Sequence, residues 1–245
     1  ARVHINLNAY YNAINNVTEW QNFYFDDINS FSYVSITGGK KAYYGVEAAL
    51  KYKVNSAFDI KLLGTVSEAK NTNDANVNYL NSTQGVYNED KLLNKDMRES
   101  GTPLTAASAI LSYHKKGWFI DLAGNYYDRI YLGYSLYYRY KSIGEKRGNV
   151  DSNGNVLRIA QDKGKGGFML DASIGKSIYL KKGSLSINLM LTNVLNNQNI
   201  VTGGYEQSRS DFTASGNARA YKFSRNPKKY YAYGTNGMLN ITYKF

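Results

Sequence analysis

Alternation of apolar and polar residues with a period of two is the dominant pattern of this chain. Between residues 3 and 11 every second residue is apolar, and most of the residues between them are polar. Such alternation is typical of a β-strand with one apolar and one polar face. Seven further segments show the same pattern, near residues 43–54, 57–68, 104–115, 118–131, 167–179, 184–195 and 230–245. The pattern predicts an all-β fold of about eight antiparallel strands, with one domain over residues 1–245.

The connections between these segments alternate strictly between short and long. The short ones lie near residues 55–56, 115–117 and 181–183, and the long ones cover about 15–40, 70–103, 132–166 and 203–229. A water-soluble meander has no reason to alternate in this way. Outer-membrane β-barrels do alternate, because short turns face the periplasm and long loops face outside. The sequence therefore predicts an antiparallel transmembrane β-barrel with short periplasmic turns and long extracellular loops.

Composition and charge narrow the alternatives. The mean hydropathy is −0.49, and the absence of a run of about 18 apolar residues excludes a helical membrane protein. The sequence has no cysteine, which excludes disulfides and thiolate zinc sites. The net charge is +11, but Lys and Arg are spread along the whole chain, which argues against a nucleic-acid partner. Loops that face anionic lipopolysaccharide or an anionic ligand fit this distribution, as does plain solubility.

Aromatic residues stand near the ends of several predicted strands. Interfacial girdles of aromatic side chains flank the apolar surface of a membrane barrel. A soluble Tyr-rich β-protein stays open as the alternative. The aromatic residues in question are Tyr52, Phe58, Tyr113, Trp118, Tyr179 and Tyr243.

Three segments carry a family resemblance. Residues 41–52 resemble a barrel strand with the pattern (N/Y)xGVExxLxY, and residues 189–199 resemble a penultimate strand with NLxNxxY, although Ile200 replaces the usual aromatic residue. Residues 239–245 resemble a closing strand that ends in a terminal Phe. Together these segments are similar to the barrel of TonB-dependent outer-membrane receptors, in the Asn- and Tyr-rich style of the Bacteroidota and their SusC-like branch.

The resemblance implies a larger protein and a function. Such receptors have 22 strands, a plug inside the barrel and a short segment that binds TonB. No plug-like segment precedes Ala1, so we expect a fragment that holds the last eight strands. The expected function is uptake of a bulky nutrient (glycan, siderophore, haem or peptide) across the outer membrane of a Gram-negative bacterium, without enzymatic activity or a cofactor. A self-contained small barrel that acts as an adhesin or anchor is the alternative.

The expected partners follow from the same resemblance. They are outer-membrane lipid and lipopolysaccharide, TonB through a region absent from this sequence, and a surface lipoprotein that covers the loops. The barrel-assembly machinery is a further partner, because Tyr243 and Phe245 resemble the terminal signal that it reads.

Aromatic clusters in the predicted loops are the candidate substrate-binding residues. Aromatic faces can stack on sugars, peptides or an aromatic ligand, and Arg139 could bind a carboxylate or phosphate. The alternative is that the tyrosines pack the loops against one another. The candidates are Trp20, Tyr24, Tyr134, Tyr137, Tyr138, Arg139 and Tyr140.

Catalytic and metal sites find little support. His4 and His114 are the only histidines, and no nearby Ser, Asp or ligand spacing frames a triad or a metal site. We therefore interpret both as polar residues that face the barrel lumen; an outer-membrane hydrolase is the alternative. Residues 151–155 have a faint calcium-loop spacing, but Asp162 stands where the loop needs a bidentate Glu. A turn is the better interpretation of that segment.

Overall fold

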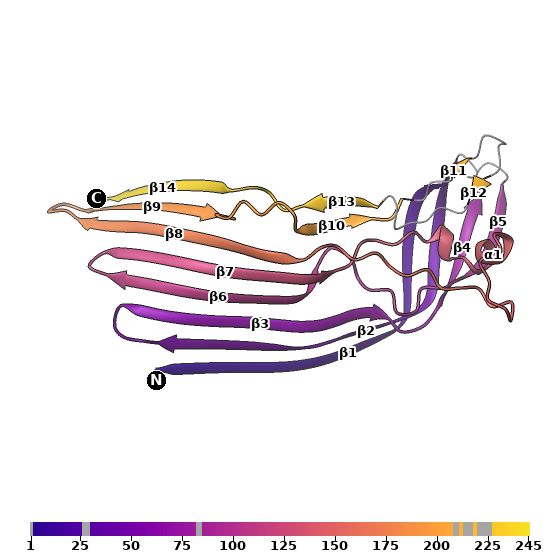
Figure 1. Cartoon of the computed structure of the whole chain (residues 1–245), viewed down its shortest axis with the longest axis horizontal. Helices are drawn as coiled ribbons and strands as arrows, with labels where there is room; N and C mark the ends of the chain where they lie inside the picture. The colour runs from indigo at the N-terminus through magenta and orange to yellow at the C-terminus, as the bar shows by residue number, and fades with distance from the viewer. Residues whose placement is uncertain (1, 26–29, 82–84, 208–210, 213–217, 220–226) are drawn as a thin grey trace.

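The computed structural model describes the chain except for residues 1, 26–29, 82–84, 208–210, 213–217 and 220–226. Its main feature is an antiparallel sheet of eight long strands in the order β14-β9-β8-β7-β6-β3-β2-β1 (Figure 1). The all-β antiparallel prediction is thus confirmed. The strands are β1 (Val3–Phe25), β2 (Ser30–Lys53), β3 (Phe58–Asn71), β6 (Pro103–Lys115), β7 (Trp118–Ile130), β8 (Gly167–Tyr179), β9 (Ser184–Thr192) and β14 (Asn236–Lys244).

One end of the sheet, here called the turn end, holds the three short turns and both chain termini (Figure 1). In the first turn the Asn55 side chain accepts hydrogen bonds from the backbone N–H groups of Ala57 and Phe58. In the second, Gly117 has a φ of +78°, and a Cβ there would clash with the Ser177 carbonyl oxygen. Turn chemistry of this kind fixes the register of the flanking strands.

The opposite end, here called the loop end, holds the long connections (Figure 1). The hairpin of β4 (Ala75–Asn81) and β5 (Val86–Leu92) joins the edge of β2, and β10 (Val201–Tyr205) pairs with β13 (Lys228–Tyr231). Residues 131–166 form the 3-10 helix η2 (Tyr137–Arg139), the short helix α1 (Lys141–Lys146) and irregular backbone. A further short pair consists of β11 (Asp211–Phe212) and β12 (Ala218–Arg219).

Two predicted boundaries are wrong. The predicted loop over 15–40 consists largely of strand, because β1 and β2 continue past the sheet and pair as far as Phe25 and Ser30. The register shifts between Ile14 and Glu19, and Asn16 and Gly38 adopt positive φ there. Such a bulge lets a strand bend and still keep its partner, and both strands turn away from the sheet at the loop end (Figure 1). The predicted last strand over 230–245 is divided into β13 and β14.

The eight strands have one apolar and one polar face, as predicted. Strand register aligns the apolar residues across the whole sheet: Leu7 lies opposite Ala48, and Leu122 lies opposite both Leu111 and Ala172. Many of these side chains are exposed to solvent. We call this surface the apolar band. Its exposed large members include Val3, Ile5, Leu7, Tyr11, Tyr44, Val46, Tyr52, Phe58, Leu62, Val66, Leu111, Trp118, Leu122, Tyr126, Phe168, Ile174, Leu189, Leu239, Ile241 and Tyr243.

The polar face carries hydrogen bonds that run across the strands. Ser108 Oγ and Asn125 Oδ1 are 2.7 Å apart, and Asn125 Nδ2 donates to Asp171 over 2.8 Å. Asp171 in turn accepts from the backbone N–H of Asn193 over 2.8 Å. Asn193 is 1% exposed, and its side chain also binds backbone atoms of Asn197 and Tyr233. Asn193 therefore holds the turn that follows β9 against the backbone that precedes β14.

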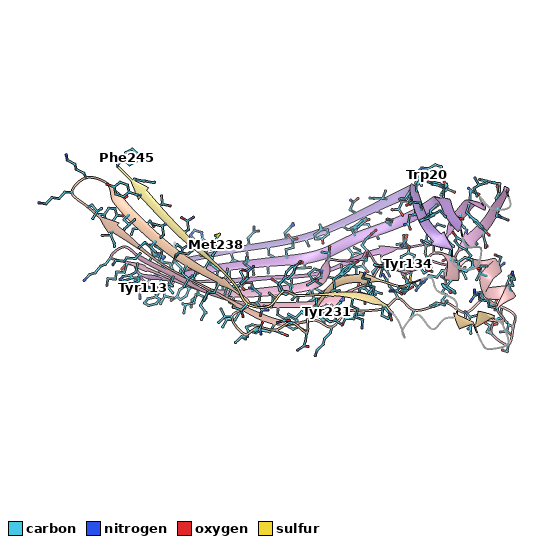
Figure 2. All side chains as sticks on the ribbon, turned by 90° about the horizontal axis from the view of Figure 1, so that it is seen from above. Trp20, Tyr113, Tyr134, Tyr231, Met238 and Phe245 are labelled. Carbon is cyan, nitrogen blue, oxygen red and sulfur yellow. The ribbon has the colours of Figure 1, made fainter. Side chains whose placement is uncertain are left out.

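The sheet is open. In the described residues β1 pairs only with β2 and β14 only with β9, and no closed barrel forms. Figure 2 shows that the sheet is curved, with β1 and β14 rising on the same side of its middle strands. Buried apolar clusters lie towards the loop end, and the larger one unites β2, β4, β5 and the η2 region.

Candidate functional site

A cavity of about 480 Å³ at the loop end is the candidate ligand site. β1 and β2 form one wall, the 98–100 segment forms another, and the start of the 131–166 connection forms a third. Lys41 and Asn71, which lie opposite each other in the sheet, continue the polar face into it. The lining residues are Glu19, Trp20, Gln21, Lys41, Asn71, Arg98, Glu99, Ser100, Gly133, Tyr134 and Leu136.

Lys41 is the centre of charge in this cavity. Its Nζ forms ion pairs with Glu19 and, at 2.9 Å, with Glu99, whose carboxylate also accepts from the Tyr43 hydroxyl. Burial by itself lowers the pKa of Lys41, but the two carboxylates outweigh it and hold the pKa above its ordinary value. The ammonium group therefore stays charged and fixes both carboxylates at the cavity wall.

Tyr134 supplies the aromatic part of the wall. Its hydroxyl oxygen accepts from the side-chain amides of Asn71 and Asn94 at 3.4 and 3.3 Å. Burial raises the pKa of Tyr134. Its ring lies 5.1 Å from the guanidinium carbon of Arg139, a cation–π distance. Of the predicted aromatic candidates, Tyr134 and Trp20 line the cavity, and Trp20 is strongly exposed.

Arg139 is engaged within the protein. It forms a two-pronged ion pair with Glu206, at 2.6 and 2.9 Å, in which both side chains are fully buried. The same guanidinium donates to the carbonyl oxygens of Ser135 and Ala160. Its guanidinium is thus engaged by a carboxylate of this chain. That Arg139 binds the carboxylate or phosphate of a ligand stays one of the two interpretations of the sequence.

The other predicted aromatic residues whose side chains the structure describes pack within the protein. Tyr140 is fully buried in the larger apolar cluster, stacked on Tyr79 at 5.2 Å, and Tyr137 packs against that cluster. Tyr138 is 6% exposed and lies 4.9 Å below the guanidinium of Arg147. These contacts favour the packing interpretation for all three. Tyr24 belongs to β1, but its side chain lies outside the described residues.

The closing residues Tyr243 and Phe245 lie at the turn end, and Figure 2 places Phe245 at the tip of β14. Both side chains are exposed, their rings are 6.0 Å apart, and the Tyr243 hydroxyl donates to the Lys182 carbonyl over 3.0 Å. The contact joins the last strand to the β8–β9 turn. Their predicted role in barrel assembly stays a prediction.

His114 has an acidic partner that sequence reasoning missed. His114 Nε2 lies 3.3 Å from Asp59 Oδ2 on the polar face, and Asp59 is largely buried. Ser112, two residues before His114, hydrogen-bonds Asp121 over 2.5 Å. Strand register explains the grouping, since Asp59 and Asp121 both lie opposite Ser112. The alternation places Asp59, Ser112 and His114 on the polar faces of their strands. It does not fix which residues of β3 and β6 lie opposite each other, because a long connection joins these two strands.

The 151–155 segment forms a turn, as interpreted. Asp151 Oδ1 accepts from the backbone N–H groups of Asn153 and Asn155, and Gly154 has a φ of +81°. Within the described ranges, no group of three or more His, Cys, Asp or Glu side chains could hold a metal ion. A search of those ranges also finds no helix of the length and apolarity needed to cross a membrane.

Comparison with known proteins gives no relative. No known protein family, curated protein or solved structure matches the chain. We therefore infer the role of the loop-end cavity from the chemistry of its lining residues. Fixed carboxylates, a lysine, amides and aromatic rings offer donors, acceptors and a stacking surface, which suits binding of a polar ligand.

Proposed function

We propose that the chain is part of the wall of an outer-membrane β-barrel and that the complete protein is a TonB-dependent receptor for a bulky nutrient. The apolar band carries this proposal. Eight neighbouring strands expose large apolar side chains on one face and a hydrogen-bonded polar network on the other. A monomer in water rarely exposes a contiguous apolar surface of this kind, whereas a membrane barrel turns it towards lipid.

The height of the band supports the proposal. Along β1 the band runs from Val3 to Tyr11, along β3 from Phe58 to Val66, and along β7 from Trp118 to Tyr126. A tilted strand crosses a bilayer with about 9–11 residues. Charged side chains limit the band at both ends. At the loop end they include the ion pairs of Glu68 with Arg98 and of Asp128 with Lys163.

Two neighbouring residues of β1 test the membrane assignment. Leu7 belongs to the apolar band and Asn6 to the polar face, and both are exposed in the structure. In a bilayer, Leu7→Arg places a charge among lipid chains and costs about 2–4 kcal/mol, whereas Asn6→Arg faces the lumen and has a small effect. In a water-soluble protein both changes stay within about 0.5 kcal/mol. Urea unfolding of both variants in lipid vesicles measures the difference, and equal small effects would contradict the proposal.

Uptake is supported by the cavity over the polar face. A ligand that binds between Lys41, Trp20 and Tyr134 lies above the lumen side of the wall. The mass of the native polypeptide in an outer-membrane fraction tests this part. A mass several-fold above 27.6 kDa supports the receptor, whereas a mass near that value favours a self-contained adhesin or anchor.

A further inference from the structure

Two lysines interrupt the apolar band at the turn end. In the described strands, from the level of Gly64 down to the turns, Lys115 and Lys176 are the charged residues in its alternating positions. On β8, Lys176 follows Ile174 on the face of the strand whose other side chains are apolar or small. A charge among lipid-facing residues is costly unless its head reaches the interface. The position of these lysines therefore marks the level of the lipid headgroups.

Trp118 lies between the two lysines. Strand register places Lys115 opposite Trp118 on one side and Lys176 opposite it on the other. Lys176 Nζ is 4.6 Å from the centroid of the Trp118 ring and donates to the Lys116 carbonyl over 2.8 Å. Lys115 is exposed. The result is a row of cation, aromatic ring and cation across β6, β7 and β8, which we call the Lys-Trp-Lys row.

The surroundings of the row are basic. The described segments at the turn end (residues 2–3, 53–59, 113–119, 176–185 and 243–245) contain a single acidic side chain, Asp59. Asp59 lies on the opposite face and contacts His114. The basic residues of these segments, besides His114 and the two lysines of the row, are Arg2, Lys53, Lys116, Lys181, Lys182 and Lys244. A potential of one sign at the membrane surface attracts anionic headgroups.

We infer that the Lys-Trp-Lys row binds the phosphate headgroup of an anionic phospholipid in the leaflet at the turn end. The two ammonium groups bind the phosphate oxygens, and the indole ring packs at the level of the glycerol backbone, where Trp is favoured. The next row of the apolar band, on the side away from the turns, consists of Tyr113, Ile120 and Ile174. These side chains lie beside the acyl chains. This inference rests on the proposed function, because it requires the apolar band to face lipid.

Native mass spectrometry of the full-length protein, purified from outer membranes in mild detergent, tests the inference. Phosphatidylglycerol and phosphatidylcholine with identical acyl chains are titrated in parallel. We expect tighter binding of phosphatidylglycerol. Lys115→Gln combined with Lys176→Gln weakens this binding roughly tenfold or more, since each lysine near an anionic surface contributes severalfold. It weakens the binding of phosphatidylcholine much less, because the choline cation of that lipid offsets the charge of its phosphate. Inorganic phosphate at millimolar concentration does not displace the lipid.

A matched control is Lys181→Gln combined with Lys182→Gln, which removes the same charge from the neighbouring turn. It weakens phosphatidylglycerol binding much less than the variant of the row. Equal losses in both double variants, or equal affinity of the unaltered protein for the two lipids, would overturn the inference. If the glutamine variant does not assemble, Lys115→Arg with Lys176→Arg must keep the preference for phosphatidylglycerol. Absence of the protein from the membrane fraction contradicts the proposed function itself, whereas membrane residence without lipid preference contradicts only the lipid site.

Discussion

Apolar side chains are exposed in the turn-end half of the molecule and buried in the loop-end half. In the turn-end half, Ile5 and Leu7 are 76% and 70% exposed, and no second layer covers them in the described part of the chain. In the loop-end half, Leu92 and Tyr140 are fully buried among β2, β4, β5 and the residues around η2. The loop end thus has a buried core of its own, whereas the turn end leaves large apolar side chains uncovered in the described part of the chain.

Each half therefore obtains its stability from a different source. The turn-end half depends on backbone pairing, on the hydrogen bonds of its polar face and on its surroundings, because its apolar side chains have few partners in the described part of the protein. The loop-end half depends on packing and on buried polar contacts between connections that are distant in sequence. Substitutions can separate these two sources of stability.

The buried ion pair is the most sensitive contact of the loop end. Arg139→Ala leaves the Glu206 carboxylate buried without its partner and should destabilise the loop end by about 3–5 kcal/mol. Hydrogen exchange of the backbone amides in residues 131–146 measures this local loss. Amides of the turn-end strands β6 and β7 should keep their protection. Replacement of both partners, Arg139→Met with Glu206→Leu, should recover most of the stability, and a double variant as weak as the single one would contradict this account.

Matched leucines test the comparison directly. Leu92→Ala removes a fully buried side chain and should cost about 2–5 kcal/mol. Leu122→Ala removes a side chain that is 43% exposed in the apolar band, leaves no closed cavity and should cost about 1 kcal/mol or less in lipid. Urea unfolding in lipid vesicles, with hydrogen exchange to locate the change, compares the two. Equal losses would mean that the apolar band packs against protein.

The sequence predicted the turn end far better than the loop end. Alternation with a period of two needs only local information, so the faces of β3, β6, β7 and β8 followed from the residues alone. Contacts at the loop end depend on which distant segments meet. Arg139 and Glu206 are 67 residues apart, and no local pattern relates them. The continuation of β1 and β2 was missed for a related reason, because a bulge between Ile14 and Glu19 interrupts the alternation that identifies a strand.

Substitution of Asp162 should have the smallest effect on stability. It tests the contribution of a buried charge at the loop end separately from that of apolar packing. Burial raises the pKa of its carboxyl group, and the nearby Glu206 raises it further, against the opposing effects of Lys229 and Arg139. Its Oδ2 is buried and has no hydrogen-bond partner among the residues that the structure describes. A raised pKa means that the folded protein holds the proton more tightly than the unfolded chain. The stabilising contribution of Asp162 is therefore complete below the unfolded value of 3.8 and is lost as the pH rises through the folded value.

At neutral pH, Asp162→Asn should therefore stabilise the loop end, by about 1 kcal/mol or less, because an amide carries no charge to bury. The gain should shrink towards zero as the pH falls below the unfolded value, where the aspartic acid is already neutral. Hydrogen exchange of residues 131–146 at several pH values, corrected for the intrinsic exchange rate, follows this change. A loss of stability in Asp162→Asn at neutral pH would show that the ionised carboxylate is favoured, as it would be if Lys229 and Arg139 outweighed burial. The turn end should not respond at any pH, since Asp162 belongs to the 131–166 connection at the loop end.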